Sequence, residues 1–173
     1  MSDSENIHLS EIGRLAILAG SIERHMADLT ALLVSPDSSE VGYTVVKRQQ
    51  FSGLAQLANQ VLINRLKNPD SRYFDLLDPI SKWITDARKV MQWRNQLLHA
   101  TWMFYPISSQ ALILRRGGET EDISIEKIRG YVAIAEKVDL RGGKLWEEFL
   151  DRCGHLDALI EATKRIDPDW FGE

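Results

Sequence analysis

The sequence predicts a mainly all-α fold, an up-and-down bundle of four to five helices with a short β-hairpin after the third helix. Four segments place apolar residues three and four positions apart, which is the period of an amphipathic helix. Short apolar runs with clustered turn residues occur only between about residues 103 and 118. At 173 residues the chain fits one core, so we expect a single domain over residues 1–173, with its core at about 9–165.

The composition is that of an ordinary globular protein, with 44% hydrophobic and 27% charged residues. The net charge of −4 excludes an overall field that attracts nucleic acid or an anionic membrane, so any such contact must be local. Cys153 is the only cysteine, which excludes an intrachain disulfide and argues against a thiolate zinc site. There is no signal peptide and no apolar run near the roughly 20 residues of a membrane span. We therefore expect a cytoplasmic protein with no metal and no cofactor.

Two helices are expected in the first part of the chain. The first runs over about residues 9–34 and ends at Ser35-Pro36-Asp37-Ser38-Ser39, because proline cannot continue the hydrogen-bond ladder. A loop follows to about Val41. The second helix is expected at about residues 43–66, with its start left open, and Asn68-Pro69-Asp70-Ser71 interrupts the pattern.

The third predicted helix, with a candidate kink at Pro79, can be laid out at about 100° per residue. One row is apolar except for a single arginine, and its members are Ile80, Ile84, Ala87, Met91, Arg94 and Leu98. A second row, which we call the polar row, ends at an imidazole and consists of Arg88, Gln92, Asn95 and His99. An arginine in the middle of an apolar row is unusual, because a buried guanidinium is costly to desolvate.

The hairpin is predicted from the apolar runs at residues 103–106 and 111–114, with Ser108-Ser109 between them and Gly117-Gly118 after them. A lone hairpin is marginally stable in water, so we expect it to lie against the helices.

Ser124 is a candidate cap for the last helical region. Within this region, Gly142-Gly143 favours a break, because each glycine costs about 1 kcal/mol in a helix relative to alanine. However, Gly142 shares a row with Ala135 and Trp146, which suits close packing of one unbroken helix. Both alternatives remain open.

The best candidate for chemistry is the set Arg94, Asn95 and His99, which lies within six positions. A phosphate-directed cation, an imidazole and an orienting amide are the groups that phosphoryl chemistry needs. A structural interpretation is also open. A buried Arg94 would pair with Glu23 or Asp28 of the first helix, while Asn95 and His99 cap or bridge neighbouring segments.

The positions of Arg94 and His99 favour a dimer. The two residues lie about 140° apart around an ideal helix, so one helix does not easily aim both side chains at one phosphorus atom. Two copies facing each other across a twofold axis bring His99 from each chain, and Arg94 or Arg88 from each, into one cleft. The site then belongs to a homodimer.

The segment Arg94-Asn95-x-x-x-His99, near the end of a long helix and followed by an aromatic-rich hairpin and further helices, resembles the HEPN superfamily. The signature of that family is Arg, four to six residues, then His. The resemblance covers roughly residues 9–150 in layout and six residues in sequence. It implies a helical bundle that dimerises with both motifs at the interface.

The resemblance also implies an activity, that of a metal-independent endoribonuclease. His99 would be the general acid/base for attack of a ribose 2′-OH on the adjacent phosphate, Arg94 the phosphate ligand and Asn95 the orienting residue. Arg88 and Gln92 are the expected substrate-binding residues. Because many family members act in toxin–antitoxin or phage-defence systems, the expected partners are RNA and a cognate antitoxin or other protein. The alternative is a non-catalytic HEPN-like module that binds a protein or a nucleotide.

Overall fold

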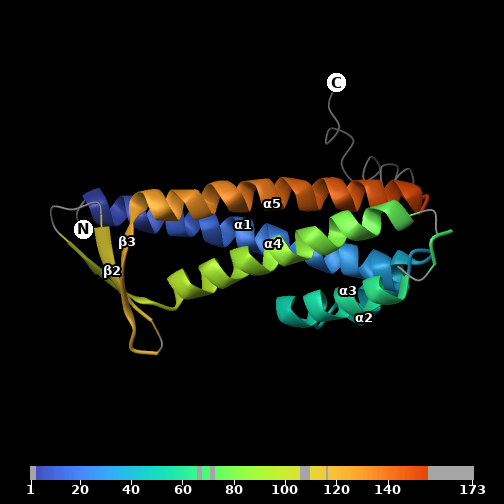
Figure 1. The fold of residues 1–173 in the computed structure, drawn as a ribbon, viewed down its shortest axis with the longest axis horizontal. Helices are drawn as coiled ribbons and strands as arrows, with labels where there is room; N and C mark the ends of the chain where they lie inside the picture. The colour runs from blue at the N-terminus through green and yellow to red at the C-terminus, as the bar shows by residue number, and fades with distance from the viewer. Residues whose placement is uncertain (1–2, 66–67, 71–72, 106–109, 116, 156–173) are drawn as a thin grey trace, which may run out of the picture. The chain divides into compact units, whose positions relative to one another are not determined.

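The protein is mainly helical, as the sequence predicts (Figure 1). The computed structural model describes residues 3–65, 68–70, 73–105, 110–115 and 117–155. This part of the chain forms five helices, with a three-stranded antiparallel sheet between the fourth and the fifth. The elements are α1 (Asp3–Val34), α2 (Ser39–Val46), α3 (Phe51–Arg65), α4 (Phe74–Leu98), β1 (Thr101–Phe104), β2 (Gln110–Leu114), β3 (Thr120–Ser124) and α5 (Ile125–Arg152). None of the described helices is long and apolar enough to cross a membrane.

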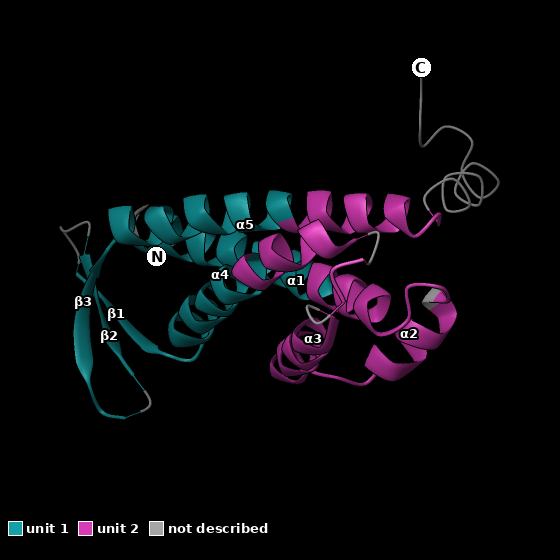
Figure 2. Cartoon of the chain, turned by 45° about the vertical axis from the view of Figure 1, so that its right-hand side comes forward, with its two compact units in different colours: residues 1–24, 83–141 teal, residues 25–82, 142–173 magenta. Residues whose placement is uncertain are grey.

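The chain divides into two compact units, coloured in Figure 2. Unit 1 comprises residues 1–24 and 83–141, and unit 2 comprises residues 25–82 and 142–173. The helices α1, α4 and α5 each contribute residues to both units. The single domain over residues 1–173 remains a prediction. Unit 1 contains the whole predicted site.

The core of unit 1 is built from the apolar rows of α1, α4 and α5. The rows consist of residues at helical spacing that are almost fully buried, namely Ile12, Leu15 and Ala19 of α1, Trp83, Ala87 and Val90 of α4, and Ile128, Val132 and Ala135 of α5. The indole N–H of Trp83 donates to the backbone oxygen of Val138 at 2.7 Å. This bond joins α4 to α5 and satisfies a polar group that would otherwise be buried without a partner.

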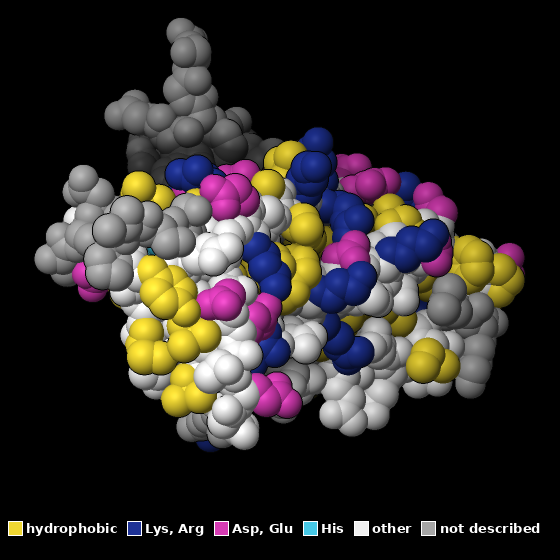
Figure 3. Space-filling view, turned by 60° about the vertical axis from the view of Figure 1, so that its left-hand side comes forward, with side chains coloured by type: hydrophobic (Ala, Val, Ile, Leu, Met, Phe, Trp, Pro, Cys, Tyr) yellow, Lys and Arg dark blue, Asp and Glu magenta, His cyan; other side chains and the backbone are white. Residues whose placement is uncertain are grey.

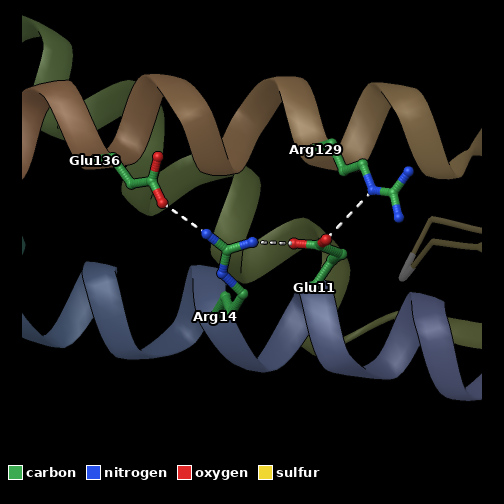
Figure 4. Close-up of polar contacts among 4 residues, drawn as sticks. All are labelled: Glu11, Arg14, Arg129 and Glu136. Carbon is green, nitrogen blue, oxygen red and sulfur yellow. Dashed lines mark hydrogen bonds and ion pairs between the residues drawn. The ribbon is translucent and has the colours of Figure 1, made fainter.

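Four charged side chains connect α1 to α5 within unit 1 (Figure 4). Arg14 donates to Glu11 at 3.1 Å and to Glu136 at 2.7 Å, and Arg129 donates to Glu11 at 3.3 Å. The Arg14–Glu136 pair is exposed, and such pairs contribute about 0–1 kcal/mol, whereas Glu11 is buried and its charge is balanced by Arg14 and Arg129.

The predicted hairpin is present as β1 and β2, and a third strand, β3, extends it to a sheet of order β1-β2-β3. We did not expect β3 because its five residues include one apolar side chain, Ile123, which is buried. The turn before it requires glycine, since Gly118 has a φ of 83°. The predicted turn at Ser108-Ser109 lies outside the described residues.

The expected second helix is wrong in its extent, because unit 2 has two helices there, α2 and α3. Helix α2 also begins at Ser39, inside the expected loop. Its backbone touches α1 closely, since a Cβ on Gly42 would lie 2.2 Å from the oxygen of Ala31. The residues of the break, 47–50, include neither proline nor glycine, so nothing in the local sequence indicates it.

The last helix is unbroken, which decides between the two alternatives for Gly142-Gly143. Within unit 2, a Cβ on Gly143 would lie 3.5 Å from Cε1 of His25, which is an ordinary van der Waals contact, so α5 lies next to this side chain. Ser124 caps the helix as predicted, because its Oγ accepts from the amide of Lys127 at 3.2 Å. Helix α4 likewise continues through Pro79.

Candidate functional site

The candidate site lies at the C-terminal end of α4. Asn95 belongs to its last turn, Arg94 directly precedes that turn, and His99 is the first residue after Leu98, where the helix ends. Thr101 then begins β1, so the chain changes from helix to strand within two residues of the imidazole. The site is therefore placed where the last carbonyl oxygens of a helix have no amide partners within it.

The polar row faces solvent along its whole length. All four members, Arg88, Gln92, Asn95 and His99, are exposed, as their spacing predicts. Arg88 makes no ion pair with any described carboxylate. The nearby acid on the same helix, Asp86, is already engaged by Arg141 at 2.7 Å and by Lys89 at 3.4 Å.

The electrostatics of Asp86 agree with this pairing. The hydrogen bond from Arg141, and to a smaller extent that from Lys89, holds the pKa of Asp86 below its ordinary value. Because Asp86 already balances these two cations, it is not a partner for Arg88 or Arg94. Figure 3 shows one face of the molecule, on which lysine and arginine side chains near the centre are interspersed with aspartate and glutamate side chains.

Arg94 is half-buried and its guanidinium is bound by a neutral partner. Its Nη1 donates to Oδ1 of Asn95 at 2.8 Å. Its Nε is buried and has no hydrogen-bond partner among the residues that the structure describes. No carboxylate of the described chain forms an ion pair with Arg94, although other arginines do so, namely Arg14, Arg115, Arg129, Arg141 and Arg152.

The structural interpretation expected an acid of the first helix to pair with Arg94. Glu23, which belongs to the same unit, makes no ion pair with Arg94 within the described residues. Asp28 belongs to unit 2, where it accepts a hydrogen bond from the hydroxyl of Tyr43 at 2.7 Å. The expected pairing with Glu23 is therefore not observed.

Asn95 links the other two residues of the motif. Its side chain holds Arg94, and its backbone oxygen accepts from the amide of His99 at 3.2 Å. On an ideal helix Asn95 lies about 100° from Arg94 and about 40° from His99. The hydrogen bond therefore connects the guanidinium of Arg94 to a member of the polar row, while the side chains of Arg94 and His99 still leave the helix about 140° apart.

The imidazole of His99 is available to another molecule. The side chain is exposed, and within the described ranges it makes no hydrogen bond, ion pair or ring contact. The exposure of His99 is compatible with a composite site, because a side chain buried against its own chain would not reach a substrate or a second copy. The role of each residue in catalysis stays a prediction.

Two aromatic contacts next to the motif were not found from the sequence. The indole of Trp102 donates to the backbone oxygen of Leu97 at 2.9 Å. Trp93 stacks on Tyr131 of α5, with ring centroids 4.5 Å apart and planes 13° apart. The Trp102 contact is local, and the aromatic residue just after the helix end was a usable signal. The Trp93 contact joins residues distant in sequence, which periodicity cannot pair.

A metal centre has no obvious location in the described ranges, where no three or more histidine, cysteine, aspartate or glutamate side chains are grouped to hold an ion. The known proteins give no further indication. Comparison of the chain with protein-family models, with curated proteins and with solved structures found no match.

Proposed function

We propose that this protein is a HEPN-like, metal-independent endoribonuclease that acts as a cytoplasmic homodimer, with a role as a toxin or phage-defence effector. One observation carries the proposal. The guanidinium of Arg94 has no carboxylate partner in the described chain and is held by Asn95, one turn before the exposed imidazole of His99. A cation that no described carboxylate neutralises is suited to bind an anion from another molecule.

The reaction assigns one task to each residue. His99 accepts the proton of a ribose 2′-OH, whose oxygen forms a bond to the adjacent phosphorus. The bond from phosphorus to the 5′ oxygen breaks, and that oxygen leaves as a hydroxyl after it takes the proton from the protonated His99. The products are a 2′,3′-cyclic phosphate and a 5′-OH end. Arg94 stabilises the negative charge that develops on the phosphate oxygens.

The polar row provides a path for the RNA backbone. Arg88 and His99 are eleven positions apart, which corresponds to about 16 Å along the helix axis. Arg88 and Gln92 would bind phosphates on one side of the scissile bond, with Gln92 as a neutral donor. Since few cations are involved, we expect a shallow dependence of RNA affinity on salt concentration.

The homodimer supplies the second set of groups. A twofold axis near the end of α4 places the exposed His99 of one copy beside the Arg94 of the other. One phosphate then receives its base from one chain and its cation from the partner, which the orientation of these side chains on one helix makes difficult within a single chain.

The activity is tested with end-labelled single-stranded RNA in a chelator that removes divalent metal. The wild type should cut the RNA and leave 2′,3′-cyclic phosphate ends, and a 2′-deoxy substitution at the cleaved nucleotide should block cleavage. His99→Ala should abolish cleavage without dissociating the dimer. Arg48→Ala, which removes an exposed arginine from unit 2, serves as the matched control for Arg94→Ala. RNA that the wild type leaves intact under varied conditions would refute the enzyme and favour the non-catalytic module.

The composite site is tested by mixing inactive chains. His99→Ala and Arg94→Ala are each expected to be inactive as homodimers. A heterodimer of the two retains one of two sites, with His99 from one chain and Arg94 from the partner, so an equal mixture that exchanges subunits at random should recover about a quarter of the wild-type rate. Mixtures that stay inactive although heterodimers form would place both residues of each site on one chain.

A further inference from the structure

A single hydrogen bond closes the turn that carries His99. Helix α4 ends at Leu98 and β1 begins at Thr101, so His99 and Ala100 form the whole connection. The indole N–H of Trp102 reaches back across this connection and donates to the oxygen of Leu97 at 2.9 Å. The bond satisfies the carbonyl oxygen of Leu97, which lies at the helix end, where oxygens lack intrahelical partners. It also connects the start of β1 to the last turn of α4.

The ring that makes this bond is itself held in place. Trp102 stacks on Phe104 of the same strand, with ring centroids 5.7 Å apart and planes 14° apart. The buried His8 of α1 lies against both rings, at a centroid distance of 5.7 Å from Phe104 and 6.4 Å from Trp102. The direction of the Trp102 N–H is thus determined by contacts with α1 and β1, and not by the turn alone.

His99 has no comparable anchor for its side chain. Its imidazole makes no hydrogen bond, ion pair or ring contact with another described residue, and its amide donates to the oxygen of Asn95 at 3.2 Å. The direction in which the imidazole points therefore depends on the backbone of residues 98–100. That backbone is held on one side by the Asn95 bond and on the other by the Trp102 bond.

We propose that Trp102 is a positioning residue, which holds the backbone of His99 so that the imidazole faces the scissile phosphate. The effect of Trp102 on catalysis rests on the proposed ribonuclease activity, whereas its effect on the backbone of His99 does not. A misplacement of about 1 Å at a reacting group can cost on the order of 100-fold in rate, so a turn of two residues needs such a closure.

The test compares two variants that each lose one indole–carbonyl bond. Trp102→Phe removes the bond to Leu97 and keeps an aromatic ring. Trp83→Phe removes the bond to Val138, made at 2.7 Å in the core of unit 1, and is the matched control. Amide hydrogen exchange at His99 is measured by NMR in both variants, relative to amides in the middle of α5. This ratio corrects for any global loss of stability.

Trp102→Phe should accelerate exchange at His99 by about fivefold or more, while Trp83→Phe should leave the ratio unchanged. In RNA cleavage, Trp102→Phe should lower kcat at least tenfold and leave KM unchanged, because Arg88 and Gln92 still bind the RNA. Equal His99 exchange ratios in the two variants would overturn the positioning role. Faster exchange in Trp102→Phe, with RNA uncut by the wild type, would support the closure of the turn and refute the ribonuclease.

Discussion

Arg94 donates from Nη1 to Oδ1 of Asn95 across 2.8 Å, so consecutive residues of the motif are also hydrogen-bond partners. A neutral amide fixes the direction of the guanidinium without cancelling its charge. An aspartate or glutamate in the same place would fix it equally well, but would compete with any phosphate for the cation. An amide at this position is therefore consistent with an arginine that binds a ligand.

Replacing the amide of Asn95 by a carboxylate separates the positioning of the Arg94 guanidinium from the neutralisation of its charge. Asn95→Asp should keep the contact with Arg94 but neutralise it, so the KM for RNA should rise by about tenfold and the slope of log affinity against log salt should fall by about one. Initial cleavage rates at several salt concentrations provide the measurement. Gln56→Glu adds the same charge at an exposed position of α3 and should have no such effect. Unchanged cleavage by Asn95→Asp would exclude a phosphate-binding role for Arg94.

Two glycine substitutions should change stability in opposite directions. In Gly42→Ala the new Cβ would lie 2.2 Å from the backbone oxygen of Ala31, so α2 must shift and the free energy of unfolding should fall by about 3 kcal/mol. In Gly20→Ala the Cβ meets nothing within 4 Å on an exposed face of α1, so stability should rise by about 0.5–1 kcal/mol. Urea unfolding of both variants checks the pair. A stable Gly42→Ala would contradict the close approach of α2 to α1.

The stack of Trp93 on Tyr131 should be measurable as a coupling between α4 and α5. Tyr131→Leu removes the stacking and should lower the free energy of unfolding by about 1–2 kcal/mol, whereas Tyr131→Phe keeps the ring and should cost about 0.5 kcal/mol or less. A double-mutant cycle with Trp93→Leu isolates the interaction. Additive effects in that cycle would show that the rings do not stabilise each other.

Glu121 should make part of the stability of unit 1 dependent on pH. Lys127 and Arg115 both bind its carboxylate, and the Lys127 bond is the main reason why the pKa of Glu121 lies below its ordinary value. Because the folded pKa is lower than the unfolded one, the stabilisation is complete above about pH 4.3 and is lost as the pH falls through the folded pKa.

The stability difference between the wild type and Glu121→Gln should therefore be constant from about pH 7 to 5 and shrink at lower pH. Urea unfolding at a series of pH values measures it. In a Lys127→Ala background the same difference should be smaller, because the largest cause of the shift is absent. A difference that persists unchanged down to about pH 3 would contradict the pairing.

Periodicity predicted the helices because burial of one face is the main source of helix stability in a protein. The apolar row of α1 is buried, and the polar row of α4 is exposed along its length. Periodicity did not predict β3, whose residues are mostly polar and whose pairing with β2 uses backbone groups present in every residue. Nor did it find the break between α2 and α3, because local propensity continues through residues 47–50.

For the candidate site, the sequence placed Arg94, Asn95 and His99 near one helix end, and the structure agrees. It left open which partner Arg94 takes, because a long flexible side chain can reach an acid on another helix or an amide on its own. It offered an aromatic residue just after the helix end as a signal for the Trp102 contact, but it did not identify Leu97 as the acceptor, since that contact depends on how β1 lies against α1.

The sequence by itself thus determined where helices form, which of their faces are polar, and that a basic residue, an amide and an imidazole share the end of α4. Only the tertiary structure decided that Arg94 is bound by Asn95 instead of an acid, and that α5 runs unbroken through Gly142-Gly143. For α5 the physical reason is packing, because the local preference of about 1 kcal/mol per glycine for a break is outweighed by burial of apolar side chains on both sides of the glycines, among them Ala135, Leu145 and Phe149. For Arg94 the reason is the reach of its side chain, which can bond an amide on its own helix as well as an acid on another.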